Sequence, residues 1–255
     1  MSELFHAVAQ SIHQDELCAV VTVLSGDEIG RKLLVRREGN ADGGESSVAA
    51  TGSLGDTALE QAAIDCAAEA LAARRTTRVS LPVEGQEWDL LIDVHVPQEK
   101  LVIVGAVHIA IPLVSFAREL GLYTVVVDAR PIFATQDRFG HVDELIRSWP
   151  DEALQEMNLN ESSYVVTLTH DEKLDTPALI CALDHPVGYI GALGSKRTHA
   201  KRVTALREAG VSDEQISRIH APIGLDLGGR SPGEIALAIL AEIVQVRNRS
   251  KEAGT

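Results

Sequence analysis

The sequence predicts an α/β protein in which a smaller α+β domain, residues 1–97, precedes a Rossmann-like domain with a parallel sheet, residues 98–255. Two observations indicate this fold class. From residue 101 onward, short apolar runs typical of buried strands alternate with longer helical segments, which favours parallel strands with helices on both faces. Before that point, strand patterns and glycine turns surround one alanine-rich helix, which is typical of a small mixed domain.

The first domain is expected to begin with an amphipathic helix, since Leu4, Phe5, Val8 and Ile12 recur at helical spacing. Apolar and β-branched runs then predict strands, and an alanine-rich run predicts a helix. These elements are expected as strand 17–25, strand 31–38, loop 40–47, a strand leading into the turn at 51–56, helix 57–74, strand 77–82 and strand 88–97. The last two strands are predicted to form a hairpin, followed by a joint between the domains.

The turn TGSLGD before that helix allows two interpretations. Its backbone amides and Ser53 are placed to hold an anion at the start of the helix. An ordinary turn with Asp56 as the helix cap is the commoner meaning of such a segment. The sequence leaves both open and favours the cap.

The second domain is predicted to alternate strands and helices. The expected order is strand 101–105, helix 108–120, strand 123–128, a loop region to about 160, strand 163–169, helix 177–184, strand 187–193, helix 196–209, an apolar step at 219–224 and helix 232–248. Asp175 or Thr176 before Pro177 suits the start of the first helix after the loop region. Because ligands on such sheets bind beyond the carboxyl ends of the strands, functional residues are expected in the segments that follow the strands.

The segment LVIVGAVHIAIPLV starts like the strand, turn and helix of a dinucleotide site but keeps only the first of its three glycines. Val107 and Ala110 occupy the other two positions, and Val107 is expected to hinder the close approach of a pyrophosphate. Gly105, His108 and Asp128 are candidate cofactor-binding residues. Asp128 lies 23 positions after Gly105, where such folds place the acid that binds a ribose hydroxyl. Arg130, two residues later, suits a 2′-phosphate, but an arginine at a strand end is more often a solvated or structural group. His108 is explained equally well as a structural histidine.

Three further loops after strands carry candidate binding residues. The loop LTHDEKLDTPAL offers His170 and Asp171, whose imidazole and carboxylate suit proton transfer or metal binding. The helix start GSKRT offers a glycine turn, a hydroxyl and cations that suit a phosphate. The glycine-rich loop GLDLGGR precedes a predicted capping box, SPGE. The candidates in the last two loops are Gly194, Ser195, Lys196, Gly224, Asp226 and Arg230.

Composition narrows the classes of function. The chain has 23 lysines and arginines against 37 aspartates and glutamates, a net charge of −14, so no extended surface for nucleic acid is expected. Three separated cysteines without a paired motif predict neither a disulfide framework nor a thiolate zinc site. The absence of a signal-peptide pattern and of a membrane-spanning apolar run predicts a cytoplasmic protein that does not enter the membrane.

Five segments together resemble the carboxyl-terminal domain of the XdhC/CoxI family, the accessory and maturation proteins of xanthine dehydrogenase and other molybdenum hydroxylases. These segments are GAVHIAIPL, VVVDARPIFAT, VVTLTHDEKLD, YIGALGSKRTHA and RIHAPIGLDLGGRSPGEIALAILAEI. The resemblance covers residues 101–246, and its last two segments are the most specific. RKLLV, GSLGD and DVHVP extend it more weakly into the first domain.

The resemblance implies a maturation role. Members of the family bind molybdenum cofactor transiently, protect it while a partner cysteine desulfurase installs its terminal sulfur, and deliver it to a molybdenum hydroxylase client. It implies that the candidate residues named above line a cofactor site, and that the chain is a chaperone rather than a catalyst. No catalytic residue and no metal site is assigned. The sequence leaves open the client, the mono- or dinucleotide form of the cofactor, and whether the chain forms a homodimer.

Two alternatives stand beside this interpretation. An NAD(P)-dependent oxidoreductase explains Asp128 and the fold, but the usual glycine at position 107 and a hydride-transfer pair are not evident. A metal-dependent hydrolase using the loop from His170 to Asp175 ranks third. Many family members also carry a glycine-glycine-cysteine segment where this chain has GSLGDTA. No thiol-dependent step is therefore expected at that turn, and Cys66 is expected to be a small buried residue.

Overall fold

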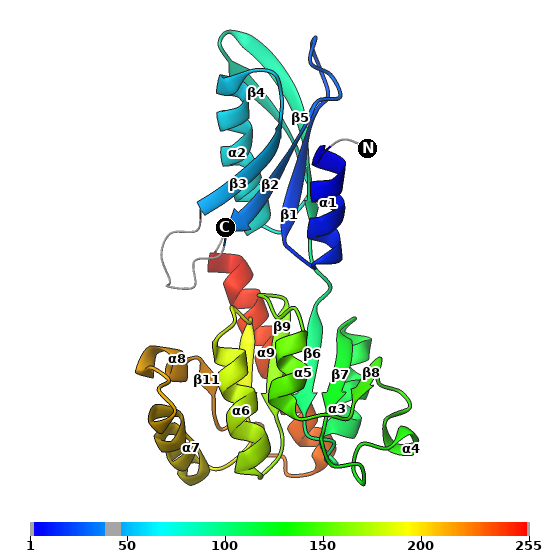
Figure 1. The fold of residues 1–255 in the computed structure, drawn as a ribbon, viewed down its shortest axis with the longest axis vertical. Helices are drawn as coiled ribbons and strands as arrows, with labels where there is room; N and C mark the ends of the chain where they lie inside the picture. Colours follow the sequence, from blue (N-terminus) through cyan, green and yellow to red (C-terminus); the bar gives the residue numbers. More distant parts are fainter. Residues whose placement is uncertain (1–2, 39–46, 254–255) are drawn as a thin grey trace. The chain divides into compact units, whose positions relative to one another are not determined.

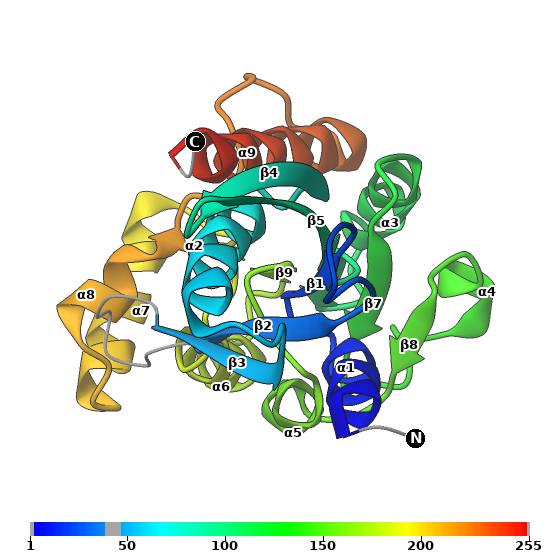
Figure 2. The ribbon, with the colours of Figure 1, turned by 90° about the horizontal axis from the view of Figure 1, so that it is seen from above.

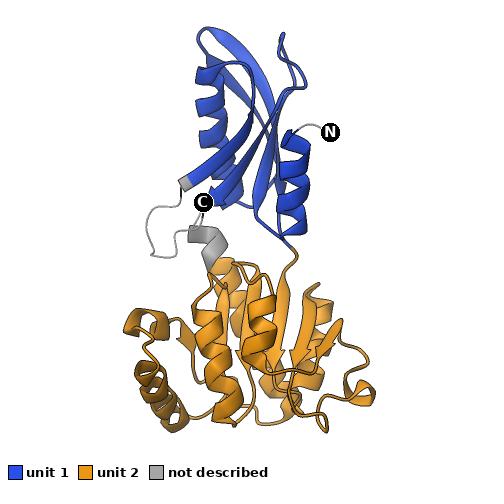
Figure 3. Cartoon of the chain, in the orientation of Figure 1, with its two compact units in different colours: residues 1–97, 251–255 blue, residues 98–250 orange. Residues whose placement is uncertain are grey.

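The computed structural model describes residues 3–38 and 47–253, and the chain divides into two compact units. Unit 1 comprises Met1–Pro97 and Lys251–Thr255, and unit 2 comprises Gln98–Ser250 (Figure 1, Figure 3). The loop expected over 40–47 lies outside the described residues except for Ser47. No helix within the described ranges is long and apolar enough to cross a membrane.

Unit 1 contains an antiparallel sheet with the spatial order β3-β2-β1-β5-β4. Its strands are β1 (Cys18–Val23), β2 (Lys32–Glu38), β3 (Ser47–Ser53), β4 (Thr77–Val83) and β5 (Gln86–His95). The central strand β1 pairs with both β2 and β5, so that Val21 lies opposite Leu33 on one side and Ile92 on the other. The predicted hairpin is confirmed, because β4 pairs with β5 in antiparallel register.

Helix α2 (Thr57–Ala72) packs on this sheet through its small and aliphatic side chains. Leu59, Ala63 and Ala67 are fully buried and recur at the four-residue spacing of one helix face. They share an apolar cluster with Val21 of β1 and Ile92 of β5. The helix predicted from the alanine-rich pattern is therefore confirmed, and the structure shows which of its faces is buried.

The predicted amphipathic helix is present as α1 (Glu3–His13), but only part of its apolar face is half-buried. Ser11 is fully buried, whereas Phe5 and Ile12 are 57% and 44% exposed. Leu4 and Val8 are half-buried. With 3.6 residues per turn, positions 4, 8 and 11 share one stripe, and positions 5 and 12 are turned away from it by about a quarter of a turn. The four apolar residues lie within about 100° of one another around the helix, as predicted for one face, but Phe5 and Ile12 at its far edge are exposed.

Unit 2 contains a six-stranded sheet with the order β11-β10-β9-β6-β7-β8, and every strand pair in it is parallel. Its strands are β6 (Lys100–Val104), β7 (Tyr123–Val127), β8 (Glu144–Ile146), β9 (Ser163–Thr167), β10 (Tyr189–Ala192) and β11 (Ile219–His220). Counted along the chain from β6, this is the order 3-2-1-4-5-6 of a doubly wound sheet. The α/β prediction is confirmed, and the strand order reverses between β6 and β9.

Alternate residues of β6 pack on opposite faces of this sheet. Leu101 and Ile103 join the apolar cluster that contains helices α3 (Ala110–Glu119) and α9 (Pro232–Ala253). Val102 and Val104 join the cluster of α5 (Pro150–Glu156), α6 (Glu172–Leu183) and α7 (Lys196–Glu208). Figure 2 shows α3 and α9 on one side of β7 and β9, with α5 and α6 on the other. Both faces are covered, which is why the strands are apolar at nearly every position.

Two expectations for unit 2 were wrong in detail. The region to about residue 160 holds α4 (Gln136–Phe139), β8 and α5 rather than a loop, and a further short helix, α8 (Asp213–Ser217), follows α7. Helix α6 begins before Pro177, at Glu172. The Asp171 carboxylate accepts the Lys173 N–H at 3.0 Å and caps the helix there. The favourable cap sets the start, and Pro177 inside the helix removes one backbone hydrogen bond.

Candidate functional site

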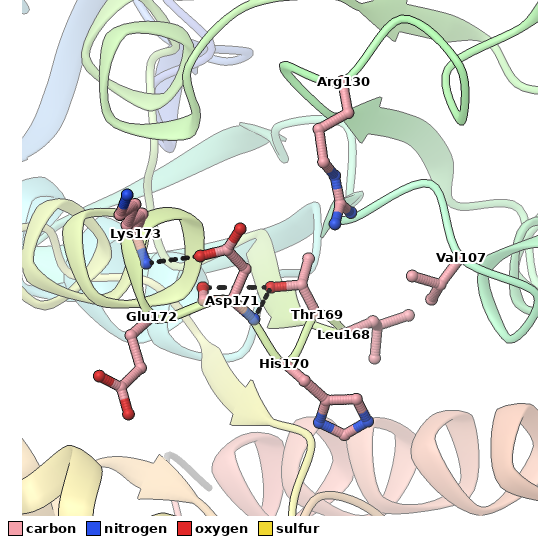
Figure 4. Close-up of a pocket in the computed structure, with 8 residues that line it drawn as sticks. All are labelled: Val107, Arg130, Leu168, Thr169, His170, Asp171, Glu172 and Lys173. Carbon is pink, nitrogen blue, oxygen red and sulfur yellow. Dashed lines mark hydrogen bonds between the residues drawn. The ribbon is translucent and has the colours of Figure 1, made fainter.

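A pocket of about 660 Å³ opens beyond the ends of β6, β7 and β9. It lies at the point where the strand order reverses between β6 and β9, which is where open α/β sheets bind their ligands. Figure 4 shows the loop after β9 forming one wall, with Val107 and Arg130 reaching in from the segments after β6 and β7. The lining residues are Val107, Arg130, Leu168, Thr169, His170, Asp171, Glu172 and Lys173.

The turn after β6 keeps its first glycine for a steric reason. Gly105 has a φ of +110°, and a side-chain carbon at this position would lie 2.5 Å from Cγ2 of Thr169. Glycine alone meets both conditions without strain. The Gly105 N–H donates to the Val127 carbonyl at 2.8 Å. Gly105 thus packs the turn after β6 against the loop after β9, while Val107 lines the pocket at the second glycine position.

Asp128 is fully buried just after β7, and its carboxylate is saturated by its neighbours. Oδ2 accepts the Ala106 N–H and Nη2 of Arg130, both at 2.8 Å, and Oδ1 accepts the backbone N–H and Nε of Arg130, both at 2.9 Å. Burial raises the pKa of Asp128, but the hydrogen bonds from the Arg130 side chain, the Arg130 amide and the Ala106 amide outweigh it and hold the pKa below its usual value. Asp128 therefore lies beneath the pocket and orients Arg130 within it.

The loop after β9 is ordered by Thr169. Its hydroxyl donates to Oδ1 of Asp175 at 2.6 Å and accepts the Asp171 N–H at 3.1 Å. Asp171 in turn caps α6, so its carboxylate stands at the positive end of that helix. His170 lies between them, exposed and in the wall of the pocket. The predicted candidates His170 and Asp171 thus share one wall with Thr169.

A smaller cavity of about 40 Å³ lies between α6 and α7 and shares His170 with the main pocket. Buried Asp175 and Arg202 face each other there, with 3.6 Å between Oδ2 and Nη2. Desolvation raises the pKa of Asp175 to about 6, although the Thr169 hydrogen bond and the Arg202 charge act against it. Desolvation also lowers the pKa of Arg202, whose Nη1 is buried without a partner among the described residues. For this pair, the free-energy cost of removing the two charges from water thus exceeds the stabilisation from their mutual attraction.

Other predicted residues lie away from the pocket lining. His108 is exposed in the turn before α3 and is not one of the lining residues. Ser195 caps α7 by accepting the Thr198 N–H at 3.2 Å. Gly194 beside it has a φ of +142°, and Lys196 is exposed. The start of α7 was predicted to bind a phosphate. One of its backbone amides, that of Thr198, already donates to the capping residue Ser195.

The glycine-rich loop before α9 is held by that helix. The Gly224 N–H donates to Oε2 of Glu242 at 2.8 Å, and the Arg230 N–H donates to Glu234 at 3.0 Å. The capping box predicted for SPGE is confirmed, because the Ser and Glu side chains each accept the other residue's backbone N–H. Asp226 and Arg230 do not belong to the pocket lining.

In unit 1, backbone amides of the turn TGSLGD donate to side chains of the turn and of α2. Asp56 caps α2 by accepting the Leu59 N–H at 2.7 Å. Glu60 accepts the Leu54 N–H at 2.8 Å and the Ser53 hydroxyl at 2.6 Å. The cap interpretation is confirmed, and the Glu60 carboxylate occupies the place in which an external anion was considered.

The cysteines lie away from the pocket and are poor thiolates. Cys18 and Cys181 are buried, and Cys66 is half-buried against the core of unit 1. Burial raises the pKa of each thiol, to about 11 for Cys18, which lowers the reactive thiolate fraction. In the parts of the chain that the structure describes, no group of three or more His, Cys, Asp or Glu side chains is arranged to hold a metal ion.

The structure brings together Gly105, Asp128, His170 and Asp171 from the predicted set at or beneath one pocket. The predicted set did not include Arg130, because a solvated or structural role was favoured over a 2′-phosphate contact; the structure places its side chain in the pocket lining. The predicted set also lacked the lining residues Val107, Leu168, Thr169, Glu172 and Lys173.

The family model of the XdhC Rossmann domain matches residues 101–243, which is more than half of the 255-residue chain. The match falls within unit 2 and includes every residue that lines the pocket.

Three curated proteins are similar to the chain. It is 28% identical over 86% of its length to the uncharacterized protein YqeB of Escherichia coli (strain K12), and 30% identical over 69% of its length to a probable xanthine dehydrogenase component of Bacillus subtilis (strain 168). It is 37% identical over 37% of its length to the molybdenum cofactor insertion chaperone PaoD of Escherichia coli (strain K12). The chain spans 41%, 51% and 30% of the lengths of these relatives, respectively.

Among solved structures, a protein described as a xanthine dehydrogenase from Bacillus halodurans is similar over 100% of this chain and 98% of its own. The TM-score is 0.55 and the sequence identity is 20%. This likeness shows a shared fold.

Proposed function

Because the chain belongs to the family of the XdhC Rossmann domain, we propose that it is an accessory protein that binds molybdenum cofactor during the maturation of a xanthine dehydrogenase-type molybdenum hydroxylase. The observation that carries this proposal is the pocket between β6 and β9, which lies within the residues matched by the family model. Its volume of about 660 Å³ is in the range of pockets that enclose small organic ligands.

The names of two relatives support the proposal. PaoD is named as a molybdenum cofactor insertion chaperone, and the Bacillus subtilis relative is named as a probable component of xanthine dehydrogenase. Since the chain spans about half or less of these proteins, the proposal concerns handling of the cofactor and assigns no hydroxylase activity to the chain.

The residues of the pocket suit a pterin that carries a phosphate and a metal-bound dithiolene. Arg130, His170 and Lys173 provide donors for anionic oxygens, and the half-buried Val107 provides apolar surface for a flat ring. When bound, the cofactor supplies the redox-active metal that the client enzyme uses. In this proposal the chain's own residues bind and orient the cofactor.

We further propose that sulfuration and delivery depend on partners. The cofactor's terminal sulfur would come from a cysteine desulfurase, because none of the three cysteines of this chain lines the pocket. The loaded chain would then dock on the apo-hydroxylase and release the cofactor. In this scheme the chain is a chaperone without turnover of its own.

NAD(P) binding is the second candidate, because the strand order of unit 2 is that of dinucleotide-binding domains. Two features of the pocket count against it. The oxygens of Asp128 are bonded to Arg130 and Ala106 instead of being free for a ribose. The Val107 side chain also lines the pocket where the second glycine would admit a pyrophosphate.

The proposal is tested by anaerobic equilibrium binding of isolated molybdenum cofactor to the purified chain, with NAD and NADP titrated under the same conditions. Saturable cofactor binding without pyridine nucleotide binding is expected. His170→Ala should weaken cofactor binding because it changes the pocket wall, while His13→Ala in α1 serves as a matched histidine control. Binding of NAD(P) without uptake of the cofactor would reverse the ranking of the two functions.

A further inference from the structure

Arg130 is held in one orientation by its neighbours. Its Nε and Nη2 donate to the two oxygens of Asp128 at 2.9 and 2.8 Å, and its guanidinium carbon lies 4.6 Å from the centre of the Phe133 ring. The Arg130 carbonyl accepts the Phe133 N–H at 3.0 Å, so one turn fixes both residues. A guanidinium fixed in this way loses little conformational freedom when it binds a ligand.

One edge of this guanidinium faces the ligand space. The Arg130 side chain lines the pocket and is 31% exposed. Its hydrogen bonds to the described residues use Nε and Nη2 and leave Nη1 free. Figure 4 shows the guanidinium pointing across the pocket toward the loop after β9. An oxygen atom of a ligand can therefore accept Nη1–H without displacing Asp128.

Asp128 stands where dinucleotide folds place the acid that binds a ribose diol. A carboxylate has about four acceptor positions, and Asp128 uses them on the amides of Ala106 and Arg130 and on two nitrogens of the Arg130 side chain. It is also 0% exposed. At this end of the pocket, a ligand thus meets a cationic donor in place of a pair of acceptors.

We propose that Arg130 recognises a phosphate monoester, and that the Asp128–Arg130 pair makes the pocket select a ligand that ends in phosphate over the same ligand ending in a hydroxyl. The inference rests on the proposed function only in placing the ligand in this pocket. The terminal phosphate of a pterin cofactor and the 2′-phosphate of a nucleotide present the same chemistry to Arg130. The two sources are therefore separate arms of the test.

The other charged residues of the pocket affect how strongly a phosphate would bind at Arg130. Figure 4 shows Glu172 and Lys173 directed away from Arg130, whereas the Asp171 carboxylate lies on the wall that Arg130 faces. A phosphate on Arg130 would therefore be repelled by Asp171. Asparagine caps a helix as well as aspartate does, so Asp171→Asn removes this negative charge and keeps the start of α6.

The test measures equilibrium binding of two matched pairs of probes to the full chain. One pair is a pterin monophosphate and the same pterin without its phosphate, and the other is 2′-AMP and adenosine. Each pair is titrated into the wild type, Arg130→Gln, Asp171→Asn and the control Arg207→Gln. Arg207 suits the control because its Nε also donates to an aspartate, Oδ1 of Asp213 at 2.7 Å, but it does not line the pocket.

The wild type and Arg207→Gln should favour the phosphorylated probe of at least one pair by roughly tenfold or more, and Arg130→Gln should lose that preference. Asp171→Asn should strengthen phosphate binding by about fourfold, because one nearby negative charge is removed. Whichever pair shows the preference identifies the source of the phosphate. A preference retained in Arg130→Gln, or absent from the wild type, would overturn the inference.

The two proposals fail differently. If the wild type takes up molybdenum cofactor but Arg130→Gln still distinguishes phosphorylated probes, the maturation role stands and the role of Arg130 is wrong. If 2′-AMP binding depends on Arg130 but no molybdenum cofactor is taken up, the role of Arg130 stands and the maturation role is wrong.

Discussion

Gly105→Ala should destabilise unit 2 by about 4 kcal/mol through two separable effects. A side-chain carbon at residue 105 would lie 2.5 Å from Cγ2 of Thr169, against about 3.5 to 4.0 Å for an ordinary carbon contact. Thr169 cannot rotate freely, because its hydroxyl donates to the buried Asp175 at 2.6 Å. The backbone at residue 105 also has a φ of +110°, which alanine adopts only with strain.

The two contributions can be assigned from known magnitudes. A residue held in such a backbone region costs roughly 1 to 3 kcal/mol, and overpacking costs roughly 1 to 3 kcal/mol more. Thr169→Ser removes the Cγ2 methyl group and keeps the hydroxyl that bonds Asp175. In that background Gly105→Ala should cost only about 2 kcal/mol, because the contact has gone and the backbone strain remains.

The assay is urea unfolding followed by tryptophan fluorescence. The chain has two tryptophans, Trp88 in unit 1 and Trp149 in unit 2, so a Trp88→Phe background makes the signal report unit 2. Gly121→Ala is the matched control, because Gly121 has a φ of +75° but no atom within 4 Å of an added side-chain carbon. Its cost should reflect backbone strain alone and should not depend on Thr169.

A double-mutant cycle tests whether contact with Thr169 contributes to the cost of Gly105→Ala. The expected coupling between Gly105→Ala and Thr169→Ser is about 2 kcal/mol, with none for Gly121→Ala. Equal costs of Gly105→Ala in the Thr169 and Ser backgrounds would refute the argument that contact with Thr169 requires glycine at this turn.

Three further predictions concern stability in the same assay. The folded-state pKa of Asp175 is raised to about 6, so its protonated form stabilises the fold fully below about pH 4, and this contribution is lost as the pH rises through 6. The free energy of unfolding of Asp175→Asn, relative to that of the wild type, should therefore rise by about 3 kcal/mol between pH 4 and 8. A difference that stays constant with pH would contradict the raised pKa. Ser195→Ala should cost about 1 kcal/mol through loss of the α7 cap, and an unchanged midpoint would show that the cap is not needed. Glu242→Leu should cost roughly 3 kcal/mol, because the Tyr189 hydroxyl and the Gly224 N–H lose their acceptor, whereas Glu242→Gln should cost much less.

Local signals in the sequence were sufficient for the fold class and for most of the longer elements, but not for α4, β8 and α5. The apolar runs of residues 101–104 and 123–127 indicated buried parallel strands, because strands covered on both faces need no polar alternation. Asp56 and the SPGE segment marked two helix starts correctly, since a cap acts within a single turn. Where two local signals competed, the prediction failed: Pro177 suggested a helix start, but Asp171 caps the helix earlier.

The site depended on contacts that local patterns do not encode. That Gly105 meets Thr169, that Asp128 holds Arg130 toward the pocket and that Asp175 faces Arg202 all follow from how separate strands and helices are placed. Sequence by itself determined the class of fold and the family resemblance, and it predicted ligand binding beyond the strand ends, because periodicity and turn chemistry are local properties. Only the tertiary structure decided which side chains line the pocket and which form all their hydrogen bonds within the protein beneath it. The reason is that the role of a carboxylate depends on which hydrogen-bond donors surround it in the folded chain.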